Sequence, residues 1–79
     1  MRAGIDDLER GAESVPALLV SIGAPRLRGL GVELPPALPD PERRLYALLA
    51  AEHGDDAHSR YNALVRRLVS YERALECAS

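Results

Sequence analysis

The sequence contains no phenylalanine, no tryptophan and no lysine, and its single cysteine is Cys77. One cysteine excludes an intrachain disulfide, and no Cys/His cluster has the spacing of a zinc finger. The aromatic and β-branched runs typical of strands are also missing. Leucine and alanine dominate the apolar residues instead, a composition that packs well between helices. The sequence therefore predicts an all-α fold.

Charge of one sign is not in excess either, because the formal net charge is −2 and acidic and basic residues are interspersed. A nucleic-acid-binding domain normally shows a basic excess or stripe. No apolar run approaches the length of a membrane span, and the opening MRAGIDDLERG lacks the apolar segment of a signal peptide. We therefore expect a cytoplasmic protein with no nucleic-acid or membrane partner.

With 79 residues the chain forms one small domain, residues 1–79. A chain of this size buries only about 60–65% of the surface that its unfolded form exposes, so a core of its own is marginal. Disulfides, metals and oligomerisation are the usual additions that stabilise such a domain. Because the sequence points to neither a disulfide nor a metal, it predicts a homo-oligomer, most simply a dimer.

The N-terminal part, residues 4–22, carries apolar residues at helical spacing: Ile5, Leu8, Ala12, Val15, Leu19 and Ile22. This pattern predicts one apolar stripe. Pro16 lies within it, and a proline inside a helix removes a backbone donor. Ser14 is a favourable N-cap for a helix with proline in its first turn. We expect two short helices, or one helix kinked near residues 13–16, ending at Gly23.

Residues 24–40 are rich in proline and glycine, so long regular structure is not expected there. Leucines still recur in the segment, whereas a disordered linker would be more polar. We predict an ordered strap whose leucines pack against the helices, with at most a helical turn at 25–30.

Residues 41–78 predict a helical hairpin. Asp40 and Pro41 are start signals for a helix over 41–53, and His53 and Gly54 are stop signals. Asp55 and Asp56 would then cap a long helix over 55–78 with their negative charge at its N-terminus. A connection this short requires the two helices to fold back antiparallel.

The long helix has a wider apolar surface than one neighbour needs. Its predicted core stripe is Tyr61, Leu64, Leu68, Tyr71, Leu75 and Ala78, and Val65 and Val69 lie about 60–100° further round. This second edge favours contact with another copy across a two-fold axis. The residues that we predict at this interface are Tyr61, Leu64, Val65, Leu68, Val69 and Glu72.

Two further sets of side chains are candidates for chemistry. Glu52, His53, Asp55 and His58 are competent metal ligands, but the same residue types are ordinary at helix ends. Tyr61, Arg60, Arg67 and His58 could form a site between subunits for a small ligand or haem, although tyrosines at such positions more often fill helix interfaces. We expect no cofactor, no metal and no catalytic residue.

The sequence thus favours a small interaction module. We expect a homo-oligomer that docks onto a larger protein and adjusts its activity or assembly, as an accessory or regulatory partner rather than an enzyme. The alternative is a ligand or cofactor binder, or a small helical enzyme, that uses Tyr61, Arg60, Arg67 and His58.

Overall fold

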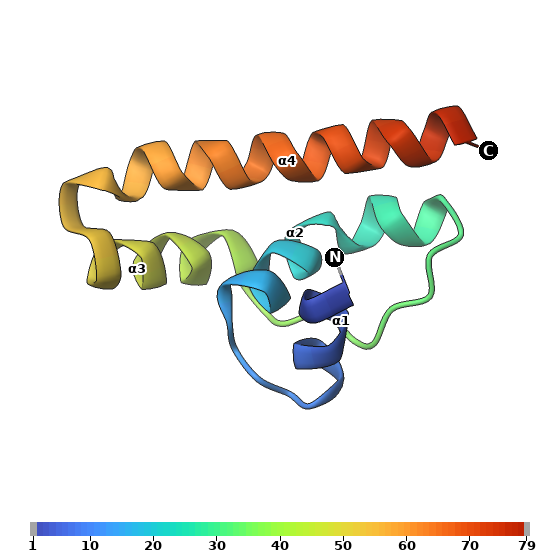
Figure 1. Ribbon diagram of the computed structural model, residues 1–79. Helices are drawn as coiled ribbons and strands as arrows, with labels where there is room; N and C mark the ends of the chain where they lie inside the picture. Colours follow the sequence, from blue (N-terminus) through green and yellow to red (C-terminus); the bar gives the residue numbers. More distant parts are fainter. Residues whose placement is uncertain (1, 79) are drawn as a thin grey trace.

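The computed structural model describes residues 2–78, and every regular element in that range is helical. The elements are α1 (Arg2–Glu9), α2 (Val15–Gly29), α3 (Pro41–His53), a 3₁₀ turn η1 (Gly54–Asp56) and α4 (Ala57–Ala78) (Figure 1). The predicted all-α fold is confirmed.

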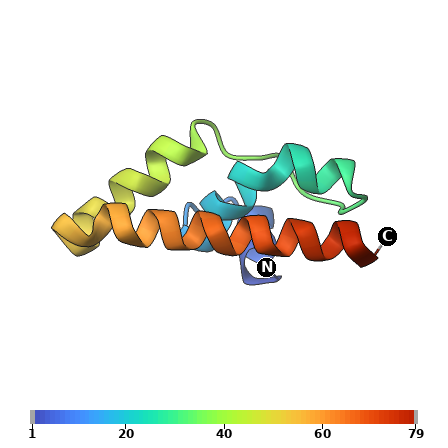
Figure 2. The same ribbon diagram turned by 90° about the horizontal axis from the view of Figure 1, so that it is seen from above.

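Helices α1, α3 and α4 all pack against α2. Helix α4 is the longest element, and it lies alongside α3 with its first half and alongside the later part of α2 with its second half (Figures 1 and 2). Helix α3 runs opposite to α4, whereas α2 runs in the same direction as α4 (Figure 1). Helix α1 packs against α2 and makes no comparable contact with α3 or α4. The side of α2 between α1 and α4 is therefore not covered by a fourth helix.

The N-terminal segment forms two helices, because the chain turns at Arg10 and Gly11. Gly11 has a φ of 72°, a conformation that glycine adopts without the steric cost of a side chain. Ser14 is the N-cap of α2, as predicted, and its Oγ accepts a hydrogen bond from the Ala17 N–H at 3.2 Å. The same hydroxyl donates to Asp7 Oδ2 at 2.7 Å, which fastens α1 to the start of α2.

Helix α2 does not end at Gly23, and this prediction was wrong. The helix continues through Pro25 to Gly29, so the proline- and glycine-rich strap begins at residue 30 instead of 24. Gly23 is buried, and a Cβ atom at this position would lie 2.8 Å from Leu68 Cδ1 of α4. The glycine therefore permits close packing of two helices and does not act as a stop signal.

The strap over residues 30–40 is held against the helices by apolar and polar contacts. Leu34 and Leu38 pack against the buried cores. The Leu38 N–H donates to Ser21 Oγ at 3.0 Å, and this buried hydroxyl in turn donates to the Ala17 carbonyl at 2.9 Å. Because the Ser21 hydroxyl is hydrogen-bonded to both the strap backbone and the α2 backbone, the strap is fixed to the middle of α2.

Helices α3 and α4 begin and end near the positions that their local signals indicate. Asp40 is the N-cap residue of α3, but its φ is 46° and its side chain makes no capping hydrogen bond. Gly54 follows α3 with a φ of 57°. Residues 54–56 form the 3₁₀ turn, so α4 starts at Ala57 and not at 55.

Most of the buried core lies in two clusters that share α2 as a wall. One contains Leu18, Leu45, Leu49 and Ala57, and the other contains Leu8, Ala17 and Val20. Of the stripe predicted over residues 4–22, only Leu8 is buried, and the others are half-buried. The stripe does not continue across the break at residues 10–14, and α2 is instead covered by neighbours on several sides.

Helix α4 is also rotated relative to its predicted stripe. Tyr71 is 38% exposed and Ala78 is exposed, whereas Glu72 is only 7% exposed. Glu72 faces Gly23, and its Oε1 lies 3.9 Å from Arg26 Nε of α2. A cation across the contact and the absent side chain at Gly23 allow the Glu72 carboxylate to be buried against α2, at a position predicted to lie at an interface between copies.

Candidate functional site

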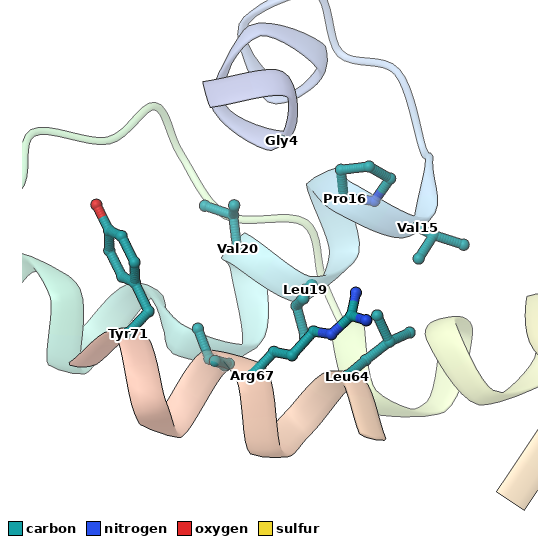
Figure 3. Close-up of a pocket in the computed structure, with 9 residues that line it drawn as sticks. Gly4, Val15, Pro16, Leu19, Val20, Leu64, Arg67 and Tyr71 are labelled. Atoms are coloured by element: carbon teal, nitrogen blue, oxygen red, sulfur yellow. The ribbon is translucent and has the colours of Figure 1, made fainter. Parts of the chain in front are cut away.

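An apolar groove of about 320 Å³ lies on α2, between α1 and α4. Its lining residues are Gly4, Val15, Pro16, Leu19, Val20, Leu64, Arg67, Leu68 and Tyr71. Figure 3 shows Tyr71 and Arg67 extending from α4 toward α2, with Gly4 of α1 on the far side. The α2 residues form the floor, and α1 and α4 form the two walls.

The groove follows from the way the chain packs. Gly4 lies so close to α2 that a Cβ atom there would be 2.6 Å from both the Pro16 carbonyl oxygen and Val20 Cγ2. This contact places α1 on one flank of α2, while Leu68 of α4 packs at Gly23 on another flank. Because the backbones of α1 and α4 do not come close to each other, the surface of α2 between them stays open.

A second depression of about 280 Å³ adjoins the groove on the α3 side. Its lining residues are Val15, Leu49, Glu52, His53, Arg60, Ala63, Leu64 and Arg67. Val15, Leu64 and Arg67 line both spaces, so the two form one continuous recessed face. Within the depression His53 Nε2 lies 3.7 Å from Glu52 Oε2, so the Glu52 carboxylate lies beside the His53 imidazole.

Two arginines of this recessed face have no ion pair within residues 2–78. Arg60 and Arg67 are exposed, and neither makes a salt bridge or a side-chain hydrogen bond. Other arginines of the chain are paired: Arg10 with Asp7, Arg44 with Glu13, and Arg26 with Glu76 at 2.7 Å. Within the described residues the two guanidinium groups therefore have no ion-pair partner, and the Glu52 carboxylate of the depression lies beside His53 instead.

The four residues proposed from the sequence for a ligand or haem site do not gather in one place on the chain. Arg60 and Arg67 line the recessed face. Tyr61 and His58 instead lie beside Tyr46, with ring centroids 5.7 Å and 6.5 Å from it. His58 Nε2 also lies 3.2 Å from Asn62 Nδ2.

Tyr61 is poorly suited to ionise. Burial of the ring, followed by the nearby Glu42 carboxylate, raises the pKa of the Tyr61 hydroxyl above its ordinary value. The aromatic pair with Tyr46 fits a packing role for Tyr61.

The candidate metal ligands are also dispersed. Glu52 and His53 lie at the end of α3, Asp55 lies in η1, and His58 is in α4 beside Tyr46. Among residues 2–78 no three His, Cys, Asp or Glu side chains are close enough together to hold a metal ion. The arrangement matches helix-end chemistry.

The predicted interface residues occupy three different settings. Leu68 and Glu72 are covered by α2 of the same chain, so a second copy cannot reach them without opening the fold. Tyr61, Leu64 and Val65 are half-buried. Val69 is 38% exposed and remains available on the edge of α4 away from the groove.

Sequence reasoning did not identify the groove as a site. Val15 and Leu19 were assigned to the core stripe, and Tyr71 to the core of α4, yet all three line the groove. The signal in the sequence was that the segments forming α2 and α4 have more apolar residues than one packing face needs. The sequence did not show which of these residues stay uncovered, because that depends on α1 packing against α2 and away from α4.

We found no match to this chain among protein-family models, among curated proteins or among solved structures. Within the described range no helix is both long enough and apolar enough to cross a membrane. The site must therefore be interpreted from its own chemistry.

Proposed function

We propose that this chain is a small helical protein–protein interaction module that docks onto a larger protein and adjusts its activity or assembly. The observation that carries the proposal is the apolar groove between α1, α2 and α4. Contiguous apolar surface that a chain leaves open commonly marks a site of interaction. The docking partner would cover Tyr71 and the exposed parts of Val15 and Leu19.

The shape of the groove supports a helical segment of the partner. From Leu64 to Tyr71 the wall formed by α4 extends over two helical turns, or about 10 Å at 1.5 Å per residue. Amphipathic helices bind in such grooves through residues at positions i, i+3, i+4 and i+7. Helical walls on both sides of the α2 floor would hold the apolar face of such a segment.

The chemistry of the lining favours binding over catalysis. The polar side chains in the groove are the Arg67 guanidinium and the Tyr71 hydroxyl. Among the described residues that line the groove there is no carboxylate, imidazole or thiol, so the groove itself offers no general base near neutral pH. Glu52 and His53 line only the adjoining depression. A surface of this composition supplies apolar contact and one fixed charge.

The module would also associate with itself, through the opposite edge of α4. Val69 is the exposed apolar residue on that edge. The chain is short enough for burial against a second copy to add substantially to a marginal core. Self-association and partner docking would then use different sides of α4 and could occur together.

A selection experiment tests the docking site. Displayed helix-forming peptides of random composition are selected against the whole protein, and a selected peptide is titrated into isotopically labelled protein. We expect amide shifts concentrated at the residues that line the groove. Tyr71→Ala should weaken binding roughly tenfold, since buried aromatic side chains are frequent hot spots.

Ser70→Ala is the matched control, because Ser70 is an exposed neighbour of Tyr71 on α4 that does not line the groove. Binding that is insensitive to Tyr71→Ala, with shifts elsewhere on the molecule, would overturn the groove as the docking site.

A further inference from the structure

The recessed face combines apolar lining with a row of positive charge on one side. Arg67 lines both the groove and the adjoining depression, and Arg60 lines the depression. Neither guanidinium has an ion pair among the residues that the structure describes, whereas Arg26 on α2 is engaged by Glu76. An incoming carboxylate would therefore not have to displace an existing acidic partner.

The spacing of the two arginines matches a helical repeat. Residues 60 and 67 are seven apart, so they lie on nearly the same side of α4 and about 10.5 Å apart along its axis. A helix lying along α4 presents its own residues i and i+7 at the same interval. Two carboxylates at that interval would each meet one guanidinium.

We infer that the segment received by the groove is an acidic amphipathic helix. Its apolar face would cover Val15, Leu19 and Tyr71, and its flank would carry Asp or Glu residues two turns apart opposite Arg60 and Arg67. The inference rests on the proposed docking function and adds the chemistry of the partner. Charge complementarity of this kind sets specificity and the rate of association.

A second copy of this chain fits the groove poorly. A two-fold contact brings the same surface of both copies together, so Arg60 and Arg67 would approach their own counterparts. The outward face of α4 carries Arg66 and Arg73, both exposed and without an ion pair in the described range. Another copy's α4 laid in the groove would therefore add like charge, which favours an occupant from a different protein.

Charge reversal at the two arginines tests the inference. The peptide selection is carried out in parallel against wild-type protein, against the Arg60→Glu/Arg67→Glu variant and against the Arg66→Glu/Arg73→Glu variant. The last is a closely matched control, because it changes two exposed arginines of the same helix at the same seven-residue spacing. Thermal unfolding followed by circular dichroism verifies that all three proteins fold.

We expect wild type and the control to enrich peptides with acidic residues at i and i+7, and the Arg60→Glu/Arg67→Glu variant to enrich basic peptides. An acidic peptide selected on wild type should bind that variant at least about tenfold more weakly, while the control should bind it within about threefold of wild type. Raising the salt concentration should weaken wild-type binding, because exposed charge pairs are screened.

The outcomes separate the inference from the proposed function. Peptides that lose affinity with Tyr71→Ala but bind the Arg60→Glu/Arg67→Glu variant normally would overturn the acidic partner and leave the docking site standing. If no peptide is enriched and dodecanoate saturates the groove instead, both proposals fall in favour of a small amphipathic acid. Groove amide shifts that depend only on protein concentration would assign the groove to a second copy and overturn the inference.

Discussion

At the scale of single residues, Gly23 illustrates how packing decides what a glycine does. It lies inside α2, and an added Cβ would be 2.8 Å from Leu68 Cδ1 and 3.2 Å from Glu72 Oε2. Leu68 is buried, so it has little freedom to move away. At Gly29, the last residue of the same helix, an added Cβ would have nothing within 4 Å.

We predict opposite effects for alanine at these two positions. Gly23→Ala should lower the free energy of unfolding by about 1 kcal/mol, because overpacking of the α2–α4 contact outweighs the gain in helix propensity. Gly29→Ala should raise it by roughly 0.5–1 kcal/mol through propensity alone. Urea denaturation of both variants measures the difference, and an equal gain at both positions would contradict the close α2–α4 contact.

Asp7 links α1 to α2 through a titratable group. The hydrogen bond from Ser14 lowers the pKa of the Asp7 carboxyl below its ordinary value of 3.8, partial burial opposes this shift, and the Arg10 charge adds to the lowering. A carboxyl whose pKa is lower in the folded state stabilises the fold above the pKa of the unfolded chain. That contribution is lost as the pH falls through the folded-state pKa.

Asp7→Asn should therefore be less stable than wild type at about pH 7, and the difference should shrink toward zero as the pH approaches about 2. An asparagine resembles the protonated carboxyl, and it lacks the negative charge that attracts the Arg10 guanidinium. The measurement is urea denaturation of both proteins across this pH range. Glu9→Gln, an exposed change on the same helix, should show no comparable trend, and a difference for Asp7→Asn that grows in acid would contradict the assignment.

At the scale of elements, Glu72 shows why α4 is rotated from its predicted stripe. Glu72 is 7% exposed and its carboxylate lies 3.9 Å from Arg26, and Arg26 also pairs with the more exposed Glu76 at 2.7 Å. The Arg26 side chain is 55% exposed, so only the carboxylate is buried, and a pair at this distance offsets little of the cost of removing that carboxylate from water. We predict that Glu72→Leu raises the free energy of unfolding by about 1 kcal/mol.

Glu76→Leu is the control, because this residue pairs with the same arginine at an exposed position one turn later. Its effect should stay within about 0.5 kcal/mol. Both variants are compared with wild type by urea denaturation. A loss of stability for Glu72→Leu would show that the carboxylate makes a contribution beyond its charge pair.

Local signals predicted some helix ends and not others. Ser14 and the Asp40–Pro41 pair marked starts, and Gly54 marked a stop, because capping depends on residues adjacent in the chain. Gly23 and Pro25 carry the same stop signals, yet α2 continues through both. Whether a glycine ends a helix or admits a neighbour depends on the residue opposite, here Leu68, which the local sequence cannot specify.

The candidate site was accessible to sequence reasoning only in fragments. Leu64 was singled out from the periodicity of the long helix, and Arg60 and Arg67 were named as candidates for a ligand site. The structure places all three on the recessed face. Val15 and Leu19 also stood out, but as core residues. The groove exists because α1 docks on α2 without reaching α4, an arrangement of separate helices that no spacing within one helix encodes.

For the molecule as a whole, the apolar surface that its own chain leaves exposed is where a second copy would bind. The second apolar edge of α4, formed by Val65 and Val69, is only partly covered by the chain. Val65 is half-buried, so Val65→Glu would disturb the fold as well as any interface, whereas Val69 is 38% exposed. Val69 therefore offers the cleaner test of self-association.

We predict that wild-type protein sediments as a dimer at micromolar concentration and that Val69→Glu sediments as a monomer with unchanged helicity. A glutamate introduced on both sides of a two-fold contact brings like charges together in an apolar interface, where an unpaired charge is strongly unfavourable. Ala74→Glu makes the same change in charge about 140° away around α4, at an exposed position, and should leave the dimer intact. Two results would exclude the Val69 edge as a contact between copies. One is a wild-type monomer at about 100 µM, a concentration far above the dissociation constant of a stable dimer. The other is an equal effect of the two substitutions on the sedimenting mass.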